Sequence, residues 1–155
     1  MGLPRKGVDS LCQKRTRPSH DERLRRFFSQ GHLNVTDELF ASNYVGHDPV
    51  SPEDVRGPQG VKEFAGMYRN AFPYVLFSIE DQVAEEDLVV TRGIASSTHQ
   101  GDLMGLAPTG NRVTVVGTSV ERIVDGQIEE TWDNYDALGM MQQIGAIPSL
   151  EEAQA

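Results

Sequence analysis

Asp133 is the residue of this sequence whose surroundings best suit acid–base chemistry. It lies in a β-prone segment, Gln127 to about Asn134, that directly follows the dipeptide Asp125-Gly126. Asp-Gly between two such segments is typical of a two-residue hairpin turn, and the turn fixes which residues face one another. Counting outward from the turn pairs Asp133 with Thr118 and places it on a largely uncharged face. A carboxylate there loses water and its pKa rises, as a general base working near neutrality requires.

The same count predicts the neighbours of Asp133. Trp132 points to the opposite face, across from Ser119, and Arg122 pairs with Glu129 near the turn. A competing interpretation is that Asp133, or Asp136, simply caps the last helix, and Asp136 is the better placed of the two. The residues expected on the face of Asp133, besides Thr118, are Val116, Val120, Thr131 and Tyr135.

Helices are predicted first along the chain. Ser19 to Glu22 forms a capping box that opens a helix, and Asn34 is placed to cap a second, short one with Val35, Leu39 and Phe40 as its apolar residues. The clearest helix begins at Pro58 and ends before Pro73. Its apolar face repeats at helical spacing through Val61, Phe64, Ala65, Tyr68 and Phe72.

After Pro73 the apolar residues recur at every second position, a period that predicts β-strands. Strands are expected from about 75 to 83, from 88 to 99, from 112 to 124 and from 127 to about 134, followed by a short helix that ends at Gly145. Helices followed by a four-strand meander favour the α+β class, with a curved antiparallel sheet packed on the helices. Such a sheet would enclose a conical pocket for a small molecule.

Composition narrows the function classes. The 155 residues and 38% hydrophobic content suit one domain, expected over 19–148, between a basic, flexible leader (1–18) and an acidic tail (149–155). Residues 1–26 carry eight basic and three acidic side chains within a total net charge of −9, so the rest is strongly acidic and nucleic acid is an unexpected partner. No membrane span or signal peptide is recognised, which predicts a cytoplasmic protein. The lone Cys12 excludes an internal disulfide, and the histidine spacing disfavours a metal site.

Seven segments of the sequence belong to one recognisable pattern: Asp37–Ala41, Tyr44–Pro49, Gly57–Val61, Gly101–Arg112, Arg122–Ile128, Trp132–Gly139 and Gln142–Gly145. Together they resemble the SnoaL-like polyketide cyclases, also called ester cyclases, over residues 20 to 148. The resemblance implies the cone-shaped nuclear-transport-factor-2-like fold, cofactor-free catalysis and a homodimer or homotetramer built through the sheet. It also implies that Asp133 is the catalytic acid/base, and it matches His99 and His47 to family histidines. A further family histidine is replaced here by Ser119.

The expected activity is an intramolecular aldol-type ring closure, by a lyase or isomerase, on a polyketide-like or other small hydrophobic metabolite. Asp133 would move the proton, and His99 or Tyr44 would donate a hydrogen bond to the developing oxyanion. Two alternatives stay open: a non-catalytic binding module of the same fold, and an epoxide hydrolase that uses Arg92 with Asp133. The candidate substrate-binding residues are His47, Tyr44, Phe64, Tyr68, Arg92, Met104, Leu106, Thr118, Ser119, Trp132 and Tyr135.

Overall fold

The α+β class predicted from the sequence is confirmed in the computed structural model, which describes residues 26–27, 31–149 and 151–154. The helical elements within these residues are η1 (Leu33–Val35), α2 (Thr36–Leu39), α3 (Gly57–Ala71), α4 (Ala137–Gln143) and η2 (Glu152–Gln154). The strands are β1 (Phe40–His47), β2 (Val55–Arg56), β3 (Leu76–Glu85), β4 (Leu88–Thr98), β5 (Arg112–Val124) and β6 (Gln127–Tyr135). The expected leader, Cys12 and the capping box at Ser19 lie outside the described residues.

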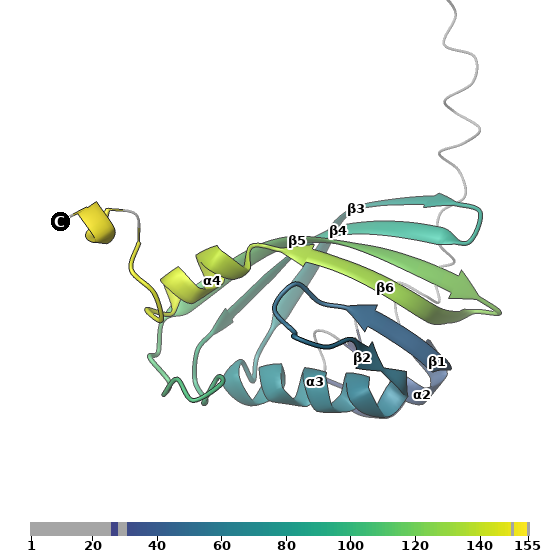
Figure 1. Cartoon of the computed structure of the whole chain (residues 1–155), viewed down its shortest axis with the longest axis horizontal. Helices are drawn as coiled ribbons and strands as arrows, with labels where there is room; N and C mark the ends of the chain where they lie inside the picture. Colours follow the sequence, from purple (N-terminus) through teal and green to yellow (C-terminus); the bar gives the residue numbers. More distant parts are fainter. Residues whose placement is uncertain (1–25, 28–30, 150, 155) are drawn as a thin grey trace, which may run out of the picture.

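One curved sheet holds all six strands in the order β2-β1-β6-β5-β4-β3. The predicted antiparallel meander forms β3 to β6. β1 joins it in parallel beside β6, and β2 pairs antiparallel to β1, so β2 and β3 are the edges. Figure 1 shows the sheet bending over α3, which lies across its concave side.

Two apolar clusters hold α3 against the sheet at its two ends. Near the start of α3, Val61 packs with buried side chains of β1 and β6, among them Phe40 and Ile128. Near its end, Ala71 and Phe72 pack with Val113 and residues of α4. Phe64 and Tyr68 lie between these positions on α3 and stay only partly buried. The middle of α3 therefore faces space rather than packed core.

The region before α3 differs from its prediction. Asn34 caps no helix. The N-cap residue is His32 for η1 and Val35 for α2, and neither makes a side-chain capping hydrogen bond. The helical segment ends at Leu39, and Phe40 begins β1. Parallel pairing with the distant β6 decides this conformation, and no local pattern signals it.

The register of the β5–β6 hairpin also differs from the prediction, by one residue. The Asp125-Gly126 turn forms as expected, with positive φ at both positions (50° and 82°). After Ile123 and Ile128 pair, however, Arg122 pairs with Glu130, so Glu129 is an extra residue, a β-bulge. Asp133 therefore lies opposite Ser119, and Thr118 lies opposite Asn134. The predicted pairs of Asp133 with Thr118, of Arg122 with Glu129 and of Trp132 with Ser119 are wrong. Val116 and Val120 lie on the opposite face from Asp133.

Asp136 caps α4, as the sequence indicated. Its Oδ1 accepts the backbone N–H of Gly139 at 2.8 Å. We expect Asp136→Ala to lower the free energy of unfolding by about 1 kcal/mol, because the N–H loses its acceptor. Asp136→Asn, which keeps an oxygen at this position, should cost much less. Urea unfolding of both variants checks this, and equal destabilisation by the two would contradict the capping role.

Candidate functional site

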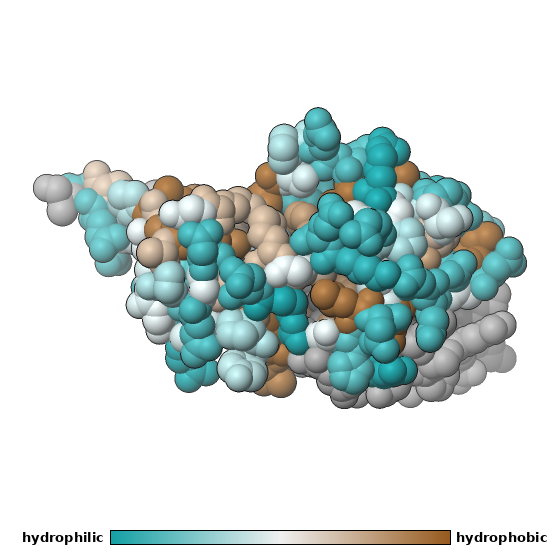
Figure 2. Space-filling model, turned by 90° about the horizontal axis from the view of Figure 1, so that it is seen from below, coloured by the Kyte–Doolittle hydropathy of each residue, from teal (hydrophilic) through white to brown (hydrophobic). Residues whose placement is uncertain are grey.

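A cavity of about 340 Å³ opens between the concave face of the sheet and α3. Its walls are mostly aromatic and aliphatic, so a bound molecule would be held chiefly by burial of apolar surface. In Figure 2 the surface is largely hydrophilic, and hydrophobic residues show at a hollow with polar neighbours. Aromatic residues that line the cavity are Phe27, Phe40, Tyr44, Phe64, Tyr68, Phe72, Phe77 and Tyr135.

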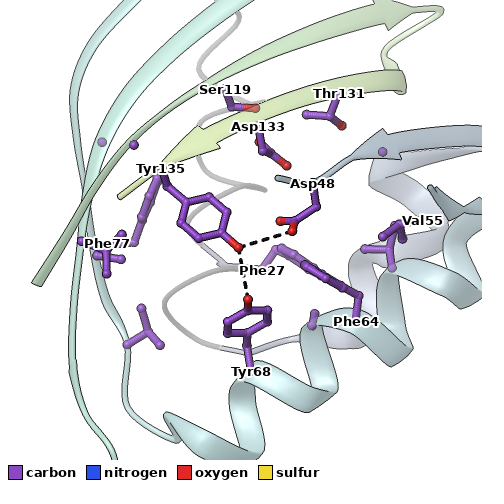
Figure 3. Close-up of a pocket in the computed structure, with 18 of the residues that line it drawn as sticks. Phe27, Asp48, Val55, Phe64, Tyr68, Phe77, Ser119, Thr131, Asp133 and Tyr135 are labelled. Atoms are coloured by element: carbon purple, nitrogen blue, oxygen red, sulfur yellow. Dashed lines mark hydrogen bonds between the residues drawn. The ribbon is translucent and has the colours of Figure 1, made fainter. Parts of the chain in front are cut away.

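Asp133 lies in this cavity on the inner face of β6 (Figure 3). Burial raises the pKa of its carboxyl from 3.8 to about 6, a hydrogen bond from Ser119 opposes the rise, and the charges of Asp48 and Glu121 add to it. The bulge at Glu129 makes Ser119 the neighbour of Asp133, and both side chains line the cavity. At neutral pH such a carboxyl is mostly ionised and a far better base than an exposed aspartate.

Two more carboxylates line the cavity. Asp48 follows β1, and its Oδ1 accepts the backbone N–H groups of Val50 at 2.9 Å and Ser51 at 3.1 Å. Glu121 lies on the inner face of β5, is 5% exposed, and pairs in register with Thr131. Both charges act on Asp133 and favour its protonated form.

Two hydroxyl pairs also line the cavity. Tyr44 and Thr131 share a hydrogen bond of 2.7 Å between their hydroxyl oxygens. Tyr68 and Tyr135 share another of 3.1 Å, and Tyr135 also donates to Asp48 at 3.4 Å. Burial raises the pKa of all three tyrosines, so their hydroxyls stay protonated across the physiological range.

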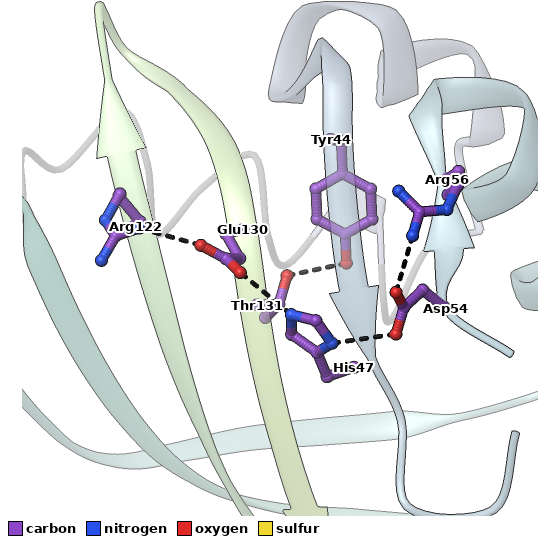
Figure 4. A network of polar contacts seen from close by, with 7 residues as sticks. All are labelled: Tyr44, His47, Asp54, Arg56, Arg122, Glu130 and Thr131. Atoms are coloured by element: carbon purple, nitrogen blue, oxygen red, sulfur yellow. Dashed lines mark hydrogen bonds and ion pairs between the residues drawn. The ribbon is translucent and has the colours of Figure 1, made fainter.

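Three predicted substrate-binding residues, His47, Arg92 and Trp132, do not line the cavity. His47 bridges two carboxylates, with Nδ1 3.0 Å from Asp54 and Nε2 2.9 Å from Glu130 (Figure 4). The hydrogen bond to Glu130, more than that to Asp54, raises the pKa of His47.

The outer face of the sheet holds these three side chains. Trp132 stacks on His47, with ring centroids 5.7 Å apart, and the Arg122 guanidinium lies 5.3 Å from the Trp132 ring. Arg92 pairs with Asp81 across β3 and β4, with Nε 2.8 Å from the carboxylate. The predicted homodimer or homotetramer would use this sheet and stays a prediction.

His99, Met104 and Leu106 are grouped near the loop between β4 and β5. His99 is fully buried. The backbone N–H of Thr109 donates to its Nδ1 at 3.3 Å, and its ring lies against that of Phe72 with the ring centroids 5.4 Å apart. Met104 is 60% exposed, and Leu106 packs against the apolar cluster at the end of α3. None of the three lines the cavity, whereas Tyr44, Phe64, Tyr68, Thr118, Ser119, Asp133 and Tyr135 do.

The comparisons with known proteins bear on this site. A family model described as SnoaL-like polyketide cyclase matches residues 19–144. The chain belongs to this family. Nogalonic acid methyl ester cyclase of Streptomyces nogalater is 26% identical over 125 residues, which span 76% of this chain and 89% of that protein. Membership supports a cyclase- or isomerase-type role for this SnoaL-like chain.

Solved structures show the same fold. IdmH of Streptomyces antibioticus, a candidate polyketide cyclase, is 30% identical with a TM-score of 0.70, covering 82% of this chain and 96% of IdmH. A Catenulispora acidiphila protein with a ketosteroid isomerase-like fold has a TM-score of 0.71 at 15% identity, covering 84% and 95%. The predicted nuclear-transport-factor-2-like fold is therefore confirmed.

Asp48 and Glu121 are two carboxylates of the cavity that sequence reasoning missed. Tyr44 and Gly46 alternate along β1, and Asp48 continues the alternation directly after its last residue, so recognising that strand would have placed Asp48 on the same face as Tyr44. Glu121 shares one face of β5 with Ser119, and the bulge at Glu129 concealed that this is the face of Asp133.

Neither a metal cluster nor a membrane span is found among the described residues. No three His, Cys, Asp or Glu side chains of residues 26–27, 31–149 and 151–154 are grouped to hold a metal ion. No helix in that part of the chain is long and apolar enough to cross a membrane.

The raised pKa of Asp133 predicts a pH-dependent cost in stability. The unfolded chain releases this proton near pH 4 and the folded chain near pH 6, so the wild type loses stability as pH rises through that window. Asp133→Asn has no carboxyl to ionise, so the variant does not lose stability in this pH window. We expect the variant to be more stable than the wild type by about 3 kcal/mol at pH 7.5, and by little at pH 4. Urea unfolding at both pH values measures this, and a pH-independent difference would contradict the raised pKa.

Proposed function

We propose that this SnoaL-like chain closes a ring in a polyketide-like substrate by an intramolecular aldol reaction, with Asp133 as general base and acid. The observation that carries the proposal is the carboxyl of Asp133 in an apolar cavity, with its pKa raised to about 6. Family membership supports the reaction class, and the name of the Streptomyces nogalater relative suggests a methyl ester of a polyketide acid as the first substrate to try.

The reaction starts at a carbon flanked by carbonyl groups, whose proton is already acidic. The Asp133 carboxylate removes this proton and the electrons pass into an enolate. The enolate carbon then attacks a second carbonyl of the same molecule, forming the carbon–carbon bond and leaving an alkoxide. Asp133 returns the proton to this oxygen, so the base is regenerated. Such proton transfer contributes on the order of 10²–10⁴-fold to the rate.

The cavity walls would supply the remaining assistance. Aromatic side chains on both sides hold the flexible substrate folded, which removes entropy before the reaction. The Tyr44–Thr131 pair has two hydroxyl hydrogens and uses one between its oxygens, so the accepting hydroxyl keeps a hydrogen for a developing oxyanion. This assigns to Tyr44 and Thr131 the role that the sequence predicted for His99 or Tyr44.

The epoxide hydrolase alternative loses the arginine that the sequence predicted for it, although another arginine, Arg69, lines the cavity. That mechanism needs an arginine beside the aspartate that activates water. Arg92, the residue predicted for it, is paired with Asp81 and does not line the cavity that holds Asp133. The binding-module alternative uses the same cavity without chemistry, and the next experiment separates it from the cyclase.

We expect Asp133→Asn to abolish proton exchange and ring closure while leaving the fold intact. The assay incubates the protein with nogalonic acid methyl ester in D₂O and follows deuterium uptake at the acidic carbon and product formation by mass spectrometry. Loss of both by at least 100-fold supports the base, since an amide cannot take the proton. Asp81→Asn, on the outer face, is the matched control and should retain full activity. Undiminished exchange in Asp133→Asn would refute the role of Asp133.

Ser119 gives a second test through the pH profile. Its hydrogen bond lowers the pKa of Asp133, so Ser119→Ala should raise that pKa and move the acid limb of kcat/KM to higher pH. Ser96→Ala, which removes the same hydroxyl from β4 where it contacts Thr114, should leave the limb in place. A limb that does not move in Ser119→Ala, or moves to lower pH, would contradict the assignment.

A further inference from the structure

Tyr68, Tyr135 and Asp48 form a hydrogen-bonded chain along one side of the cavity (Figure 3). The two phenolic oxygens are 3.1 Å apart, and the Tyr135 oxygen is 3.4 Å from Oδ1 of Asp48. The three residues come from α3, the end of β6 and the segment after β1. All three line the cavity. The proposed proton transfer at Asp133 makes no use of this chain.

Asp48 fixes the direction of every hydrogen in the chain. Its Oδ1 already accepts the backbone N–H groups of Val50 and Ser51. A carboxylate oxygen only accepts, so Tyr135 must give its single hydroxyl hydrogen to Asp48. Tyr68 must then give its own hydrogen to the Tyr135 oxygen. The Tyr68 oxygen is left with lone pairs and no hydrogen to offer.

We propose that the Tyr68 oxygen is a subsite for a hydroxyl group of the ligand, such as a phenol or an enol. A ligand hydroxyl placed there donates to Tyr68 and extends the chain. An ether or carbonyl oxygen in the same place would meet lone pairs, and burial would leave it without a donor. The subsite rests on the proposed function, since it names a group that the substrate of the Asp133 reaction must carry.

Other acceptors in the cavity compete for a ligand hydroxyl and define the controls. Asp133 also faces the cavity and accepts from Ser119. The Tyr44 and Thr131 oxygens and the Glu121 carboxylate also line the cavity and can accept hydrogen bonds. Selectivity that comes from Tyr68 must therefore survive replacement of Asp133.

The test compares 2-naphthol with 2-methoxynaphthalene, which has a similar apolar body but no hydroxyl hydrogen. We expect isothermal titration calorimetry to give the wild type about tenfold tighter binding of 2-naphthol, the ratio that one well-made hydrogen bond supplies. Tyr68→Phe should reduce this ratio to within about twofold, because the ether never used the Tyr68 hydroxyl. Asp133→Asn should keep the tenfold ratio.

Tyr135→Phe tests the direction of the chain. Without Tyr135, the Tyr68 hydrogen is released and can be donated to the ether oxygen of 2-methoxynaphthalene. Binding of this ether should therefore tighten relative to the wild type, and the ratio between the two ligands should shrink. A merely structural role for Tyr135 would weaken both ligands equally.

Three outcomes would overturn the subsite. They are equal affinity of the wild type for both naphthalenes, a preference kept in Tyr68→Phe but lost in Asp133→Asn, and no measurable binding of either compound. A failure of the proposed function is distinguishable, because proton exchange by Asp133 and naphthol selectivity by Tyr68 are separate measurements. Retained selectivity without any exchange activity would refute the cyclase and leave the subsite standing.

Discussion

Removal of water from the Asp133 carboxyl is the interaction on which the account of this protein depends. An ionised carboxylate is stabilised by water, and an apolar cavity replaces most of that water with aromatic rings. The pKa of Asp133 rises to about 6 as a result, aided by the nearby charges of Asp48 and Glu121. This burial destabilises the ionised carboxylate, but it has a functional benefit. A side chain with a pKa near 6 can both take and return a proton near neutrality.

The curved sheet and α3 together bury that carboxyl and fix its position in the cavity. Apolar clusters pack the two ends of α3 against the sheet, and the cavity lies between them. Ser119 opposes the desolvation with one hydrogen bond, which lowers the pKa of Asp133. The tyrosine chain from Asp48 adds a second polar point, separate from the base.

The parts of the fold that local chemistry dictates could be predicted from the sequence. The Asp125-Gly126 turn, the α3 repeat between Pro58 and Pro73, and the Asp136 cap each depend on neighbours within a few residues. The bulge at Glu129 could not be predicted, because any residue fits a bulge of this kind and the shift follows from the packing of the whole sheet. It moved Ser119 beside Asp133 in place of Thr118.

The candidate site was predictable at its centre and less so around it. The hairpin and the family resemblance together predict Asp133. The bulge changes which residue of β5 lies opposite Asp133, but the Asp133 side chain still lies on the inner face of the sheet. Asp48 was missed because β1 forms by long-range parallel pairing. His47, Arg92 and Trp132 look like site residues by type, and only the sheet geometry shows that their side chains do not line the cavity.

The most direct test of the central claim is the pKa of Asp133 itself. Carbon-13 NMR of the side-chain carboxyl, assigned by comparison with the Asp133→Asn spectrum, gives it in the resting protein without any substrate. The account predicts a titration midpoint near pH 6. A midpoint near 4, the ordinary value for an exposed aspartate, would mean that water reaches the carboxyl and would contradict the account.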